Sequence, residues 1–400
     1  MTQLTERRLE DLALLGRMSK RRNDLVVFIG RAGGRLTDNV KYLYLHACAG
    51  DYGFTSYFFT TNQDEYELLE KAKLPVVRLD AHGVKTLATA GAIVMDDLPR
   101  EQPEAFLLGQ GAHTIQLWHG IPLKKIGFPE VESGVNMSLE KAESLCSNYS
   151  ACRTIASTSA WVTEQLFSKV FKADFFPELG YPRNDILLRP PEKNELLNVD
   201  AECLAAVAEH RQSGGRVVAY MPTFRDTGLD FMDENGRFVL HPQQIAQFAA
   251  EHDTLFLLKL HPYVDDRRLS AIPGILRCPS RQDIYPLLPL TDALITDYSS
   301  VYMDYLLLNR PILFFAYDLR RYCAQDRELF FPYEDMTPGP IAATQEELLA
   351  NLHACLIQGQ DAREQERLAL RAKLFTHADA CASQRICKYI RKLLHTPLRV

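Results

Sequence analysis

Short apolar runs alternate with longer segments of helical periodicity along most of this 400-residue chain. A buried strand is expected wherever such a run is bounded by turn-forming residues. The expected strands lie at residues 25–30, 55–60, 75–79, 92–95, 114–117, 153–156, 216–220, 254–260, 293–295 and 312–315. Strands that alternate with helices are typical of a parallel sheet with helices on both of its faces. The pattern therefore predicts an α/β fold built from doubly wound units.

Two domains are expected, because 400 residues exceed what one ordinary hydrophobic core supports. The stretch 189–194, which contains two prolines beside charged residues, is interpreted as the linker between them. We therefore expect a first domain over 1–190 and a second domain over 195–400. The tail from 344 to 394 is mostly helical. Its last helices are expected either to stay with the second domain or to pack back on the first.

Residues 4–23 predict one basic amphipathic helix near the start of the chain. Its leucines are interspersed with the basic residues Arg7, Arg8, Arg17, Lys20, Arg21 and Arg22. A helix of this kind can lie on an anionic lipid surface. It can equally pack on its own protein with a solvated charged face, and the sequence leaves both interpretations open.

The composition is that of a globular protein, with 46% hydrophobic and 24% charged residues. The net charge of −6 argues against general nucleic-acid binding. Nine cysteines without CxxC pairs suit reduced thiols better than disulfides or zinc. The first residues lack the apolar core of a signal peptide, and no apolar run approaches the roughly 18 residues of a membrane span. We therefore expect a cytoplasmic protein, whose membrane contact, where there is any, is peripheral on the inner face of the cytoplasmic membrane.

The stretch 293–315 predicts a strand, a polar turn, a helix and a second strand. Asp297, Ser299 and Ser300 lie in the turn, directly before the helix. Adjacent hydroxyls beside backbone N–H groups that lack a helical partner can hold an anion. One interpretation is therefore a phosphate site. The other is an ordinary helix cap, because serine is a favoured N-cap in any helix.

Histidines follow two of the expected strands. His119 comes just after the strand at 114–117, and His261 comes directly after the strand at 254–260. Open α/β sheets place their ligands outside the carboxyl ends of their strands. A histidine has the near-neutral reference pKa that suits a general base, and Lys124 can meet a phosphate as a point charge. The alternative is a structural histidine and a solvated lysine.

Polar residues follow strands in both halves of the chain, including the segments 223–226 and 297–300. If two Rossmann-like domains face each other across a cleft, these strand ends meet there, as in a GT-B-like arrangement. Arg183 lies in a turn between the two halves and could reach an anion. Asp185 in the same turn is equally explained as a turn or cap residue.

Residues 118–127, WHGIPLKKIG, resemble the WHGTPLKKIG segment of the CDP-glycerol glycerophosphotransferase family, which contains teichoic-acid primases and polymerases and related capsule enzymes. Further segments match family motifs in the same order, namely DNVKY at 38–42, GYPRND at 180–185, PTFRD at 222–226, KLHP at 259–262, TDYSS at 296–300, RPIL at 310–313, YED at 333–335 and PGP at 338–340. The resemblance runs from about residue 26 to about residue 345. Ile121 stands where the family usually has Thr, and Val40 where it usually has Pro, which leaves the fine substrate choice open.

The resemblance implies a GT-B fold whose first domain binds the acceptor and whose second domain binds a CDP-activated polyol phosphate. It implies transfer of glycerol phosphate from CDP-glycerol to a hydroxyl of a glycan or lipid-linked glycan, with release of CMP, in teichoic-acid or capsule synthesis. The family's motif histidines correspond to His119, expected to be the base, and His261, expected to steady the pyrophosphate or the leaving CMP. The expected donor contacts are Thr223, Arg225, Asp297, Ser299, Ser300 and Arg327. The expected acceptor or phosphate contacts are Gly120, Lys124, Arg183, Asp185, Glu334 and Asp335.

No metal or cofactor is expected, because the sequence offers no metal-binding cluster and most GT-B enzymes bind their donor without a metal. CDP-glycerol is expected as a substrate. The chain carries little beyond the catalytic region, which favours a primase or single-transfer enzyme over a polymerase. Three alternatives stay open: a CDP-ribitol-dependent transferase, a UDP-sugar-dependent GT-B glycosyltransferase, and a non-catalytic binding module. The presence of both histidines argues against the last.

Overall fold

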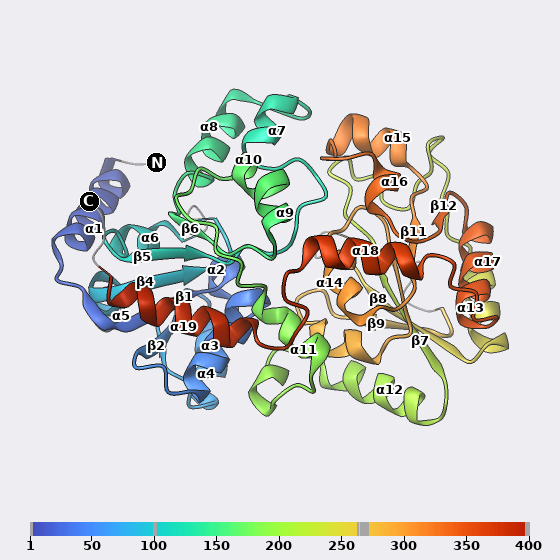
Figure 1. Cartoon of the computed structure of the whole chain (residues 1–400), viewed down its shortest axis with the longest axis horizontal. Coiled ribbons are helices and arrows are strands. Elements are labelled where there is room, and N and C mark those ends of the chain that lie inside the picture. Colours follow the sequence, from blue (N-terminus) through green and yellow to red (C-terminus); the bar gives the residue numbers. More distant parts are fainter. Residues whose placement is uncertain (1–2, 99–101, 262–263, 265–271, 397–400) are drawn as a thin grey trace.

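The computed structural model describes residues 3–98, 102–261, 264 and 272–396. It contains two parallel sheets of six strands, which confirms the predicted α/β fold with two Rossmann-like halves (Figure 1). The first sheet, called the N-sheet, has the order β3-β2-β1-β4-β5-β6, and the second, the C-sheet, has the order β12-β11-β10-β7-β8-β9. The strands of the N-sheet are β1 (Arg22–Ile29), β2 (Thr55–Phe59), β3 (Val76–Val77), β4 (Ala90–Met95), β5 (His113–Gln116) and β6 (Thr154–Ile155). The strands of the C-sheet are β7 (Arg216–Met221), β8 (Thr254–Lys259), β9 (Ile275–Cys278), β10 (Ala293–Thr296), β11 (Ile312–Phe315) and β12 (Ile341–Ala342).

The central strands of both sheets are buried on both faces. Every residue of β4, β10 and β11 is buried, as expected for the continuous apolar strands of a parallel sheet. In the N-sheet, Ile29 of β1 pairs with Met95 of β4, which in turn pairs with Gln116 of β5. The carboxyl ends of these three strands therefore lie side by side at one edge of the sheet.

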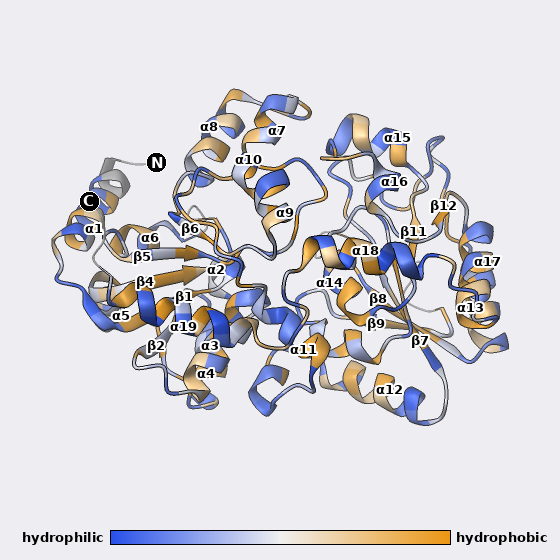
Figure 2. Ribbon diagram, viewed as in Figure 1, coloured by the Kyte–Doolittle hydropathy of each residue, from blue (hydrophilic) through white to orange (hydrophobic). Residues whose placement is uncertain are grey.

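Helices connect the strands and cover both sheets, with hydrophobic strands inside and polar helix faces outside (Figure 2). In the first half they are α1 (Gln3–Met18), α2 (Arg31–Gly34), α3 (Asp38–Ala49), α4 (Gln63–Lys71), α5 (Ala81–Thr89), α6 (Pro103–Leu108), α7 (Phe128–Ser133), α8 (Leu139–Asn148), α9 (Ala160–Val162), α10 (Ser168–Val170) and α11 (Asp185–Leu188). In the second half they are α12 (Ala201–Gln212), α13 (Pro242–Glu251), α14 (Val301–Tyr305), α15 (Leu319–Arg321), α16 (Tyr333–Met336), α17 (Gln345–Leu356), α18 (Glu364–Leu374) and α19 (Ala382–Leu394). Short 3₁₀ or π turns are η2 (Thr163–Phe167), η3 (Pro182–Asn184), η4 (Lys193–Leu196), η6 (Tyr285–Leu290), η7 (Leu306–Leu308) and η8 (Tyr322–Asp326).

The last helix, α19, lies against the N-sheet rather than the C-sheet (Figure 1). Its residues Ile386, Cys387 and Ile390 are fully buried in the same core cluster as Val26 and Phe28 of β1. The N-terminal domain is therefore built from two separate stretches of the chain. As a consequence, the polypeptide crosses between the domains twice, once through the linker and once between α18 and α19.

Several element boundaries differ from the sequence prediction for identifiable reasons. Helix α1 ends at Met18 rather than at residue 23, because β1 already begins at Arg22. The pattern does not predict β9 and β12, which are partly exposed and, in β12, only two residues long. The apolar pattern at 282–288 predicts an α-helix, but this segment contains most of the 3₁₀ turn η6, whose two prolines lack the N–H donors of an α-helix.

The two domains are tied together by Arg183, which precedes the linker and is only 3% exposed. Its Nη1 donates to Oδ1 of Asp38 at 2.6 Å and to the backbone oxygen of His119 at 3.0 Å. Its Nε donates to Oδ2 of Asp304 in α14 at 3.1 Å, and its Nη2 bonds the same carboxylate. One guanidinium therefore holds two loops of the N-terminal domain and one helix of the C-terminal domain.

Other polar contacts cross the same interface. Lys41 and Tyr42 of α3 both donate to Oδ2 of Asp283, at 2.8 Å and 2.5 Å, and this ion pair is almost completely buried. Elsewhere in the interface, the backbone N–H of Lys125 donates to the carbonyl oxygen of Glu328 at 2.8 Å. The domains are thus joined by specific polar contacts at more than one place.

Replacing Asp304 by alanine is expected to lower the free energy of unfolding by about 3–5 kcal/mol, because the charge of Arg183 then stays buried without a main partner. The control is Glu366→Ala, which removes the partner of Arg363 from an ion pair whose side chains are both 51% exposed. This control should change stability by less than about 0.5 kcal/mol. Urea unfolding followed by circular dichroism measures both variants. Equal losses would show that the buried contact does not hold the domains together.

Candidate active site

His119 lies in the turn that follows β5, at the carboxyl edge of the N-sheet. The preceding Trp118 has a left-handed φ of 58°, and the side chain of Gln116 accepts its N–H at 2.9 Å. The Nδ1 atom of His119 lies 3.1 Å from the backbone oxygen of Asp96. Because a carbonyl oxygen can only accept, Nδ1 carries the proton and Nε2 is left as the acceptor. His119 therefore has the tautomer that a general base needs.

Gly120 brings the His119 turn into direct contact with the C-terminal domain. A side-chain carbon on Gly120 would come within 3.0 Å of Ser300 Oγ and 3.2 Å of Arg183 Nη2. The φ of Gly120 is 138°, a conformation that favours glycine. The structure thus brings His119, Gly120 and Ser300 together across the domain interface, although they lie far apart in the sequence.

Asp297 and Arg225 fix the positions of the segments 222–226 and 296–300, which are called the donor-side loops. Asp297 accepts the backbone N–H of Thr223 at 2.8 Å and pairs with Nη1 of Arg225 at 2.8 Å. Arg225 is fully buried and also donates twice to Asp318, at 2.8 Å and 2.9 Å. The predicted direct donor contacts of Arg225 and Asp297 are therefore corrected, because both side chains are occupied in the protein interior. They position Thr223 and the turn at 296–300.

Hydroxyl groups at this place remain available to a ligand. Oγ1 of Thr223 is buried and has no hydrogen-bond partner among the described residues. Ser300 occupies the N-cap of α14 but makes no side-chain cap bond, and Ser299 Oγ lies 3.5 Å from the N–H of Val301. The helix-cap interpretation therefore explains the two serines poorly. Both are partly exposed beside Gly120 and the end of β10.

His261 follows β8 and stacks on Phe224, with ring centroids 5.4 Å apart. Desolvation, followed by the positive charges of Lys124 and Arg31, lowers the pKa of His261. Desolvation also lowers the pKa of Lys124 to about 8, with the charge of Asp297 acting against it. Lys124 belongs to the N-terminal domain, yet its charge lowers the pKa of His261 in the C-terminal domain. The charge of Asp297, also in the C-terminal domain, raises the pKa of Lys124. Its Nζ makes no hydrogen bond to the described part of the chain.

Arg31 is a site residue that the sequence analysis does not single out. It lies just after β1, and its Nη1 donates to Oδ2 of Asp38 at 3.0 Å. Burial, followed by the charge of Arg31, lowers the pKa of His119 to about 3, against the opposing charge of Asp38. Although burial works against it, the charges of Arg183 and Arg31 hold the pKa of Asp38 at about 2. The available sequence signal was a charged residue directly after a buried strand.

Two of the predicted acceptor or phosphate contacts have structural roles instead. Arg183 is buried between Asp38 and Asp304, as described above, and its Nε, Nη1 and Nη2 all bond groups of the protein. Asp185 is 2% exposed and accepts the backbone N–H groups of Ala382 and Ser383 at 2.8 Å and 2.9 Å. It thereby caps the first turn of α19. Both predictions are corrected for the same reason, which is that partners distant in the sequence occupy the side chains.

The remaining predicted residues lie at the rim of the site or outside it. Arg327 bonds Glu130 of the N-terminal domain, and its Nη2 lies 3.3 Å from Asp226. These two carboxylates hold Nη1 and Nη2 of Arg327, and its contact with a ligand phosphate stays a prediction. Glu334 and Asp335 are exposed on α16, and no contact among the described residues joins them to His119 or Ser300. Their neighbour Tyr333 donates to the backbone oxygen of Asp297 at 2.9 Å, and the role of the two carboxylates stays a prediction.

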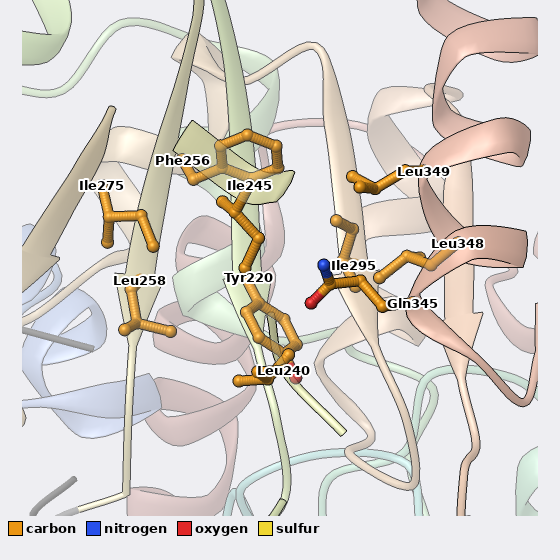
Figure 3. Close-up of a pocket in the computed structure, with 10 residues that line it drawn as sticks. All are labelled: Tyr220, Leu240, Ile245, Phe256, Leu258, Ile275, Ile295, Gln345, Leu348 and Leu349. Carbon is orange, nitrogen blue, oxygen red and sulfur yellow. The ribbon is translucent and has the colours of Figure 1, made fainter. Parts of the chain in front are cut away.

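A small apolar cavity of about 30 Å³ lies between the C-sheet and the helices α13 and α17 (Figure 3). Its walls are mainly aliphatic and aromatic side chains, and no predicted site residue lines it. It is a packing gap and not a substrate site. In the part of the chain that the structure describes, no group of three His, Cys, Asp or Glu side chains could hold a metal ion. A search of the same residues finds no helix long and apolar enough to cross a membrane.

The chain is similar to known proteins over most of its length. The family described as CDP-glycerol:poly(glycerophosphate) glycerophosphotransferase matches residues 13–392 of the chain. A teichoic acid glycerol-phosphate transferase of Staphylococcus aureus is 31% identical over 293 residues, which cover 70% of this chain and 71% of that protein. A teichoic acid ribitol-phosphate primase of Bacillus spizizenii is 29% identical over 288 residues, which cover 70% of each protein.

Solved structures share the fold. The wall teichoic acid polymerase TagF superposes with a TM-score of 0.73 at 24% identity, covering 98% of this chain and 95% of that chain. A UDP-GlcNAc 2-epimerase from Neisseria meningitidis superposes with a TM-score of 0.55 at 9% identity, covering 92% of this chain and 99% of that chain. At these identities the likenesses show the fold alone, because one fold supports many functions.

The imidazole of His119 is expected to stay neutral from about pH 8 down to about pH 5, because its pKa lies near 3 and not at the ordinary value near 6.5. Carbon-13 NMR of the ring Cε1, assigned with a His119→Gln variant, measures this. Asp38→Asn removes a charge that raises the pKa of His119, so it should not move the titration to higher pH. A midpoint near 6.5 in the wild-type protein would contradict the buried environment described above.

Proposed function

This chain belongs to the family of CDP-glycerol:poly(glycerophosphate) glycerophosphotransferases, and we propose that it transfers glycerol phosphate from CDP-glycerol to a hydroxyl of a glycan or lipid-linked glycan, releasing CMP. The observation that carries the proposal is the contact between the His119 turn and Ser300 through Gly120. This contact brings His119 of the N-terminal domain, whose Nε2 can accept a proton, next to a serine hydroxyl of the C-terminal domain. A base for the acceptor and a cradle for the donor phosphates are then neighbours.

In the proposed reaction, Nε2 of His119 accepts the proton of the acceptor hydroxyl. The acceptor oxygen attacks the β-phosphorus of CDP-glycerol, and the bond from that phosphorus to the oxygen it shares with the α-phosphorus breaks. CMP leaves with that oxygen, glycerol phosphate remains on the acceptor, and the proton passes from His119 to solvent. Because the pKa of His119 is about 3 in the free protein, it is a weak base there. The negative charge of the bound donor would raise this pKa and strengthen the base.

The donor phosphates are assigned to the hydroxyls of Thr223, Ser299 and Ser300 and to the ammonium group of Lys124. Thr223 and Lys124 are suited to this role because Oγ1 of Thr223 and Nζ of Lys124 make no hydrogen bond to the described residues. Thr223 lies in a donor-side loop, and the charge of Asp297 in the other donor-side loop acts on Lys124. His261 is assigned to the leaving CMP, since it is exposed directly after β8 and stacks on Phe224. These groups can stabilise charge that develops on the leaving oxygen.

Transfer of ribitol phosphate from CDP-ribitol is the second candidate. The similarity to a ribitol-phosphate primase, at 29% identity, supports it almost as well as the 31% identity to a glycerol-phosphate transferase supports the first. A UDP-sugar glycosyltransferase gains no support beyond the shared fold. A primase or single-transfer role stays a prediction, because the relatives include a glycerol-phosphate transferase, a ribitol-phosphate primase and polymerases. The peripheral membrane contact likewise stays a prediction. Helix α1 leads directly into the start of β1 and so lies at the amino end of that strand, away from the edge that carries His119.

His119→Ala is expected to reduce CMP release at least about 100-fold, because the acceptor hydroxyl loses its base, while the affinity for CDP-glycerol stays within about twofold. His395→Ala, a change of an exposed histidine at the end of α19, serves as the control and should leave both quantities unchanged. CMP release measures transfer, and calorimetry measures donor binding. Equal loss of transfer and binding in His119→Ala would contradict the assigned role. No CMP from either CDP-polyol with any acceptor, together with no binding, would overturn the proposed function.

The donor itself can be identified by thermal stabilisation. CDP-glycerol at about 100 times its Kd is expected to stabilise the folded protein by about 2.7 kcal/mol, which raises the melting temperature by several degrees. CDP-ribitol at the same concentration should raise it less, and UDP-GlcNAc should leave it unchanged. A larger rise with CDP-ribitol would replace glycerol by ribitol in the proposed reaction.

A further inference from the structure

We propose that Arg31 is a further phosphate-binding residue of this site, and that it contacts the phosphoryl group in transfer from the side of the N-terminal domain. The inference rests on the proposed function, because it assigns to Arg31 the oxygens of the same phosphorus that the acceptor attacks. Neither the motif segments of the sequence nor the comparisons assign a role to this residue.

The backbone places Arg31 beside His119. Both residues follow strands of the N-sheet, β1 and β5, that flank β4 on either side. The segments that carry Arg31 and His119 both also make hydrogen bonds to the residues that follow β4. The N–H of Ala32 donates to Oδ2 of Asp97 at 3.1 Å, and Nδ1 of His119 donates to the backbone oxygen of Asp96 at 3.1 Å. Arg31 and His119 therefore belong to one rigid edge of the sheet.

The guanidinium of Arg31 has donors to spare. It makes one ion pair, from Nη1 to Oδ2 of Asp38, and no other bond to the described residues involves its Nε or Nη2. Its side chain is 35% exposed, whereas those of Arg183 and Arg225 are 4% and 0% exposed and bond carboxylates through several nitrogens. Asp38 thus occupies Nη1 of Arg31 and leaves the N–H groups of Nε and Nη2, which form the free fork of this guanidinium, for a ligand.

The hydrogen bonds place this free fork beside the interface of the domains. Asp38 accepts Nη1 of Arg31 at Oδ2 and Nη1 of Arg183 at Oδ1, and Arg183 also bonds Asp304 of the C-terminal domain. The charge of Arg31 acts with desolvation to lower the pKa of His119, in its own domain, and of His261, in the other domain. The position of Arg31 beside the shared Asp38 is consistent with these two effects. Arg31 and Lys124 of the N-terminal domain both contribute positive charge at His261, and Ser300 of the C-terminal domain lies beside Gly120.

The chemistry of the step needs a cation there. While the acceptor oxygen bonds to the β-phosphorus and CMP departs, negative charge is spread over the non-bridging oxygens of the transferred group. A planar guanidinium binds two such oxygens in a fixed bidentate geometry, which the rotatable donors of an ammonium group do not impose. Arg31 would hold these oxygens beside His119 while the hydroxyls of the C-terminal domain hold the rest of the donor. The donor phosphate would partly neutralise the charge of Arg31 when it binds. The pKa of His119 would then rise, and His119 would become a stronger base.

The test compares Arg31→Gln and Arg31→Lys with the control Arg78→Gln. Arg78 is an exposed arginine of the same domain that pairs with Asp80 and lies outside the site. With CDP-glycerol as donor, Arg31→Gln should lower kcat for CMP release by about 100- to 1,000-fold, the usual effect of removing one donor to a developing charge. Arg31→Lys should recover about tenfold of that loss, and Arg78→Gln should stay within about twofold of wild type. A kcat for Arg31→Gln within about threefold of wild type overturns the proposal.

A second readout separates phosphate binding from a structural role beside Asp38. His119 is faced by Arg31, Asp38, Asp97 and the carbonyl of Asp96, and His261 by Lys124, Arg31 and Asp226. Removing the charge of Arg31 should therefore move the acidic limb of the kcat/KM profile to higher pH in Arg31→Gln and leave it in place in Arg31→Lys. An unchanged limb in Arg31→Gln, with equal losses of kcat and melting temperature in both variants, overturns the proposal.

Calorimetry with inorganic pyrophosphate keeps this test independent of the proposed reaction. Arg31→Gln should bind pyrophosphate about tenfold more weakly than wild type, even if the wild-type protein releases no CMP from any CDP-polyol. In that event the proposed function fails while the phosphate role of Arg31 stands. Equal pyrophosphate affinities of wild type and Arg31→Gln overturn the phosphate role, whatever the activity of the wild-type protein.

Discussion

The site depends on one buried guanidinium. Arg183 is surrounded by Asp38 and the His119 carbonyl on one side and by Asp304 on the other. A buried cation is stable only with its partners in place, so the distance between the His119 turn and α14 cannot drift without a large energetic cost. The hydroxyl of Ser300, directly before α14, is held against Gly120 by the same contacts. An internal ion network with no direct access to the substrate therefore fixes the geometry of the chemistry.

The charged residues of the motif segments fall into two classes with different physical fates. Arg183, Asp185, Arg225 and Asp297 are buried and bonded to protein partners, so they define where loops and helices lie. Lys124 and His261 keep an accessible polar group, as does Arg31 outside the motifs. The first class makes the scaffold rigid, and the second class is free to change partners when an anion enters. Burial, more than residue type, separates the two classes.

This division explains what the sequence could and could not predict. Apolar runs predict the central strands well, because a strand buried on both faces leaves little choice of residue, and the strand ends then locate His119 and His261 at the ligand edges. The sequence could not show that Asp185 caps α19 or that Arg183 pairs with Asp304, because these partners are remote along the chain. It could not single out Arg31 for the same reason. Only the fold shows that neighbouring loops occupy one of its nitrogens and leave the others open.

The return of α19 to the N-sheet has a mechanical consequence. The chain crosses between the domains at two places, and Asp185 bonds the start of α19, so the two crossings lie side by side. Two adjacent covalent connections restrict relative motion to a turn about a single axis near that point. Arg183 is two residues from Asp185 and therefore lies close to the axis, where displacement is smallest. A rotation of one domain against the other about this axis would displace Arg183 least, and it would strain contacts away from the axis, such as that between Lys125 and Glu328, before the central ion network.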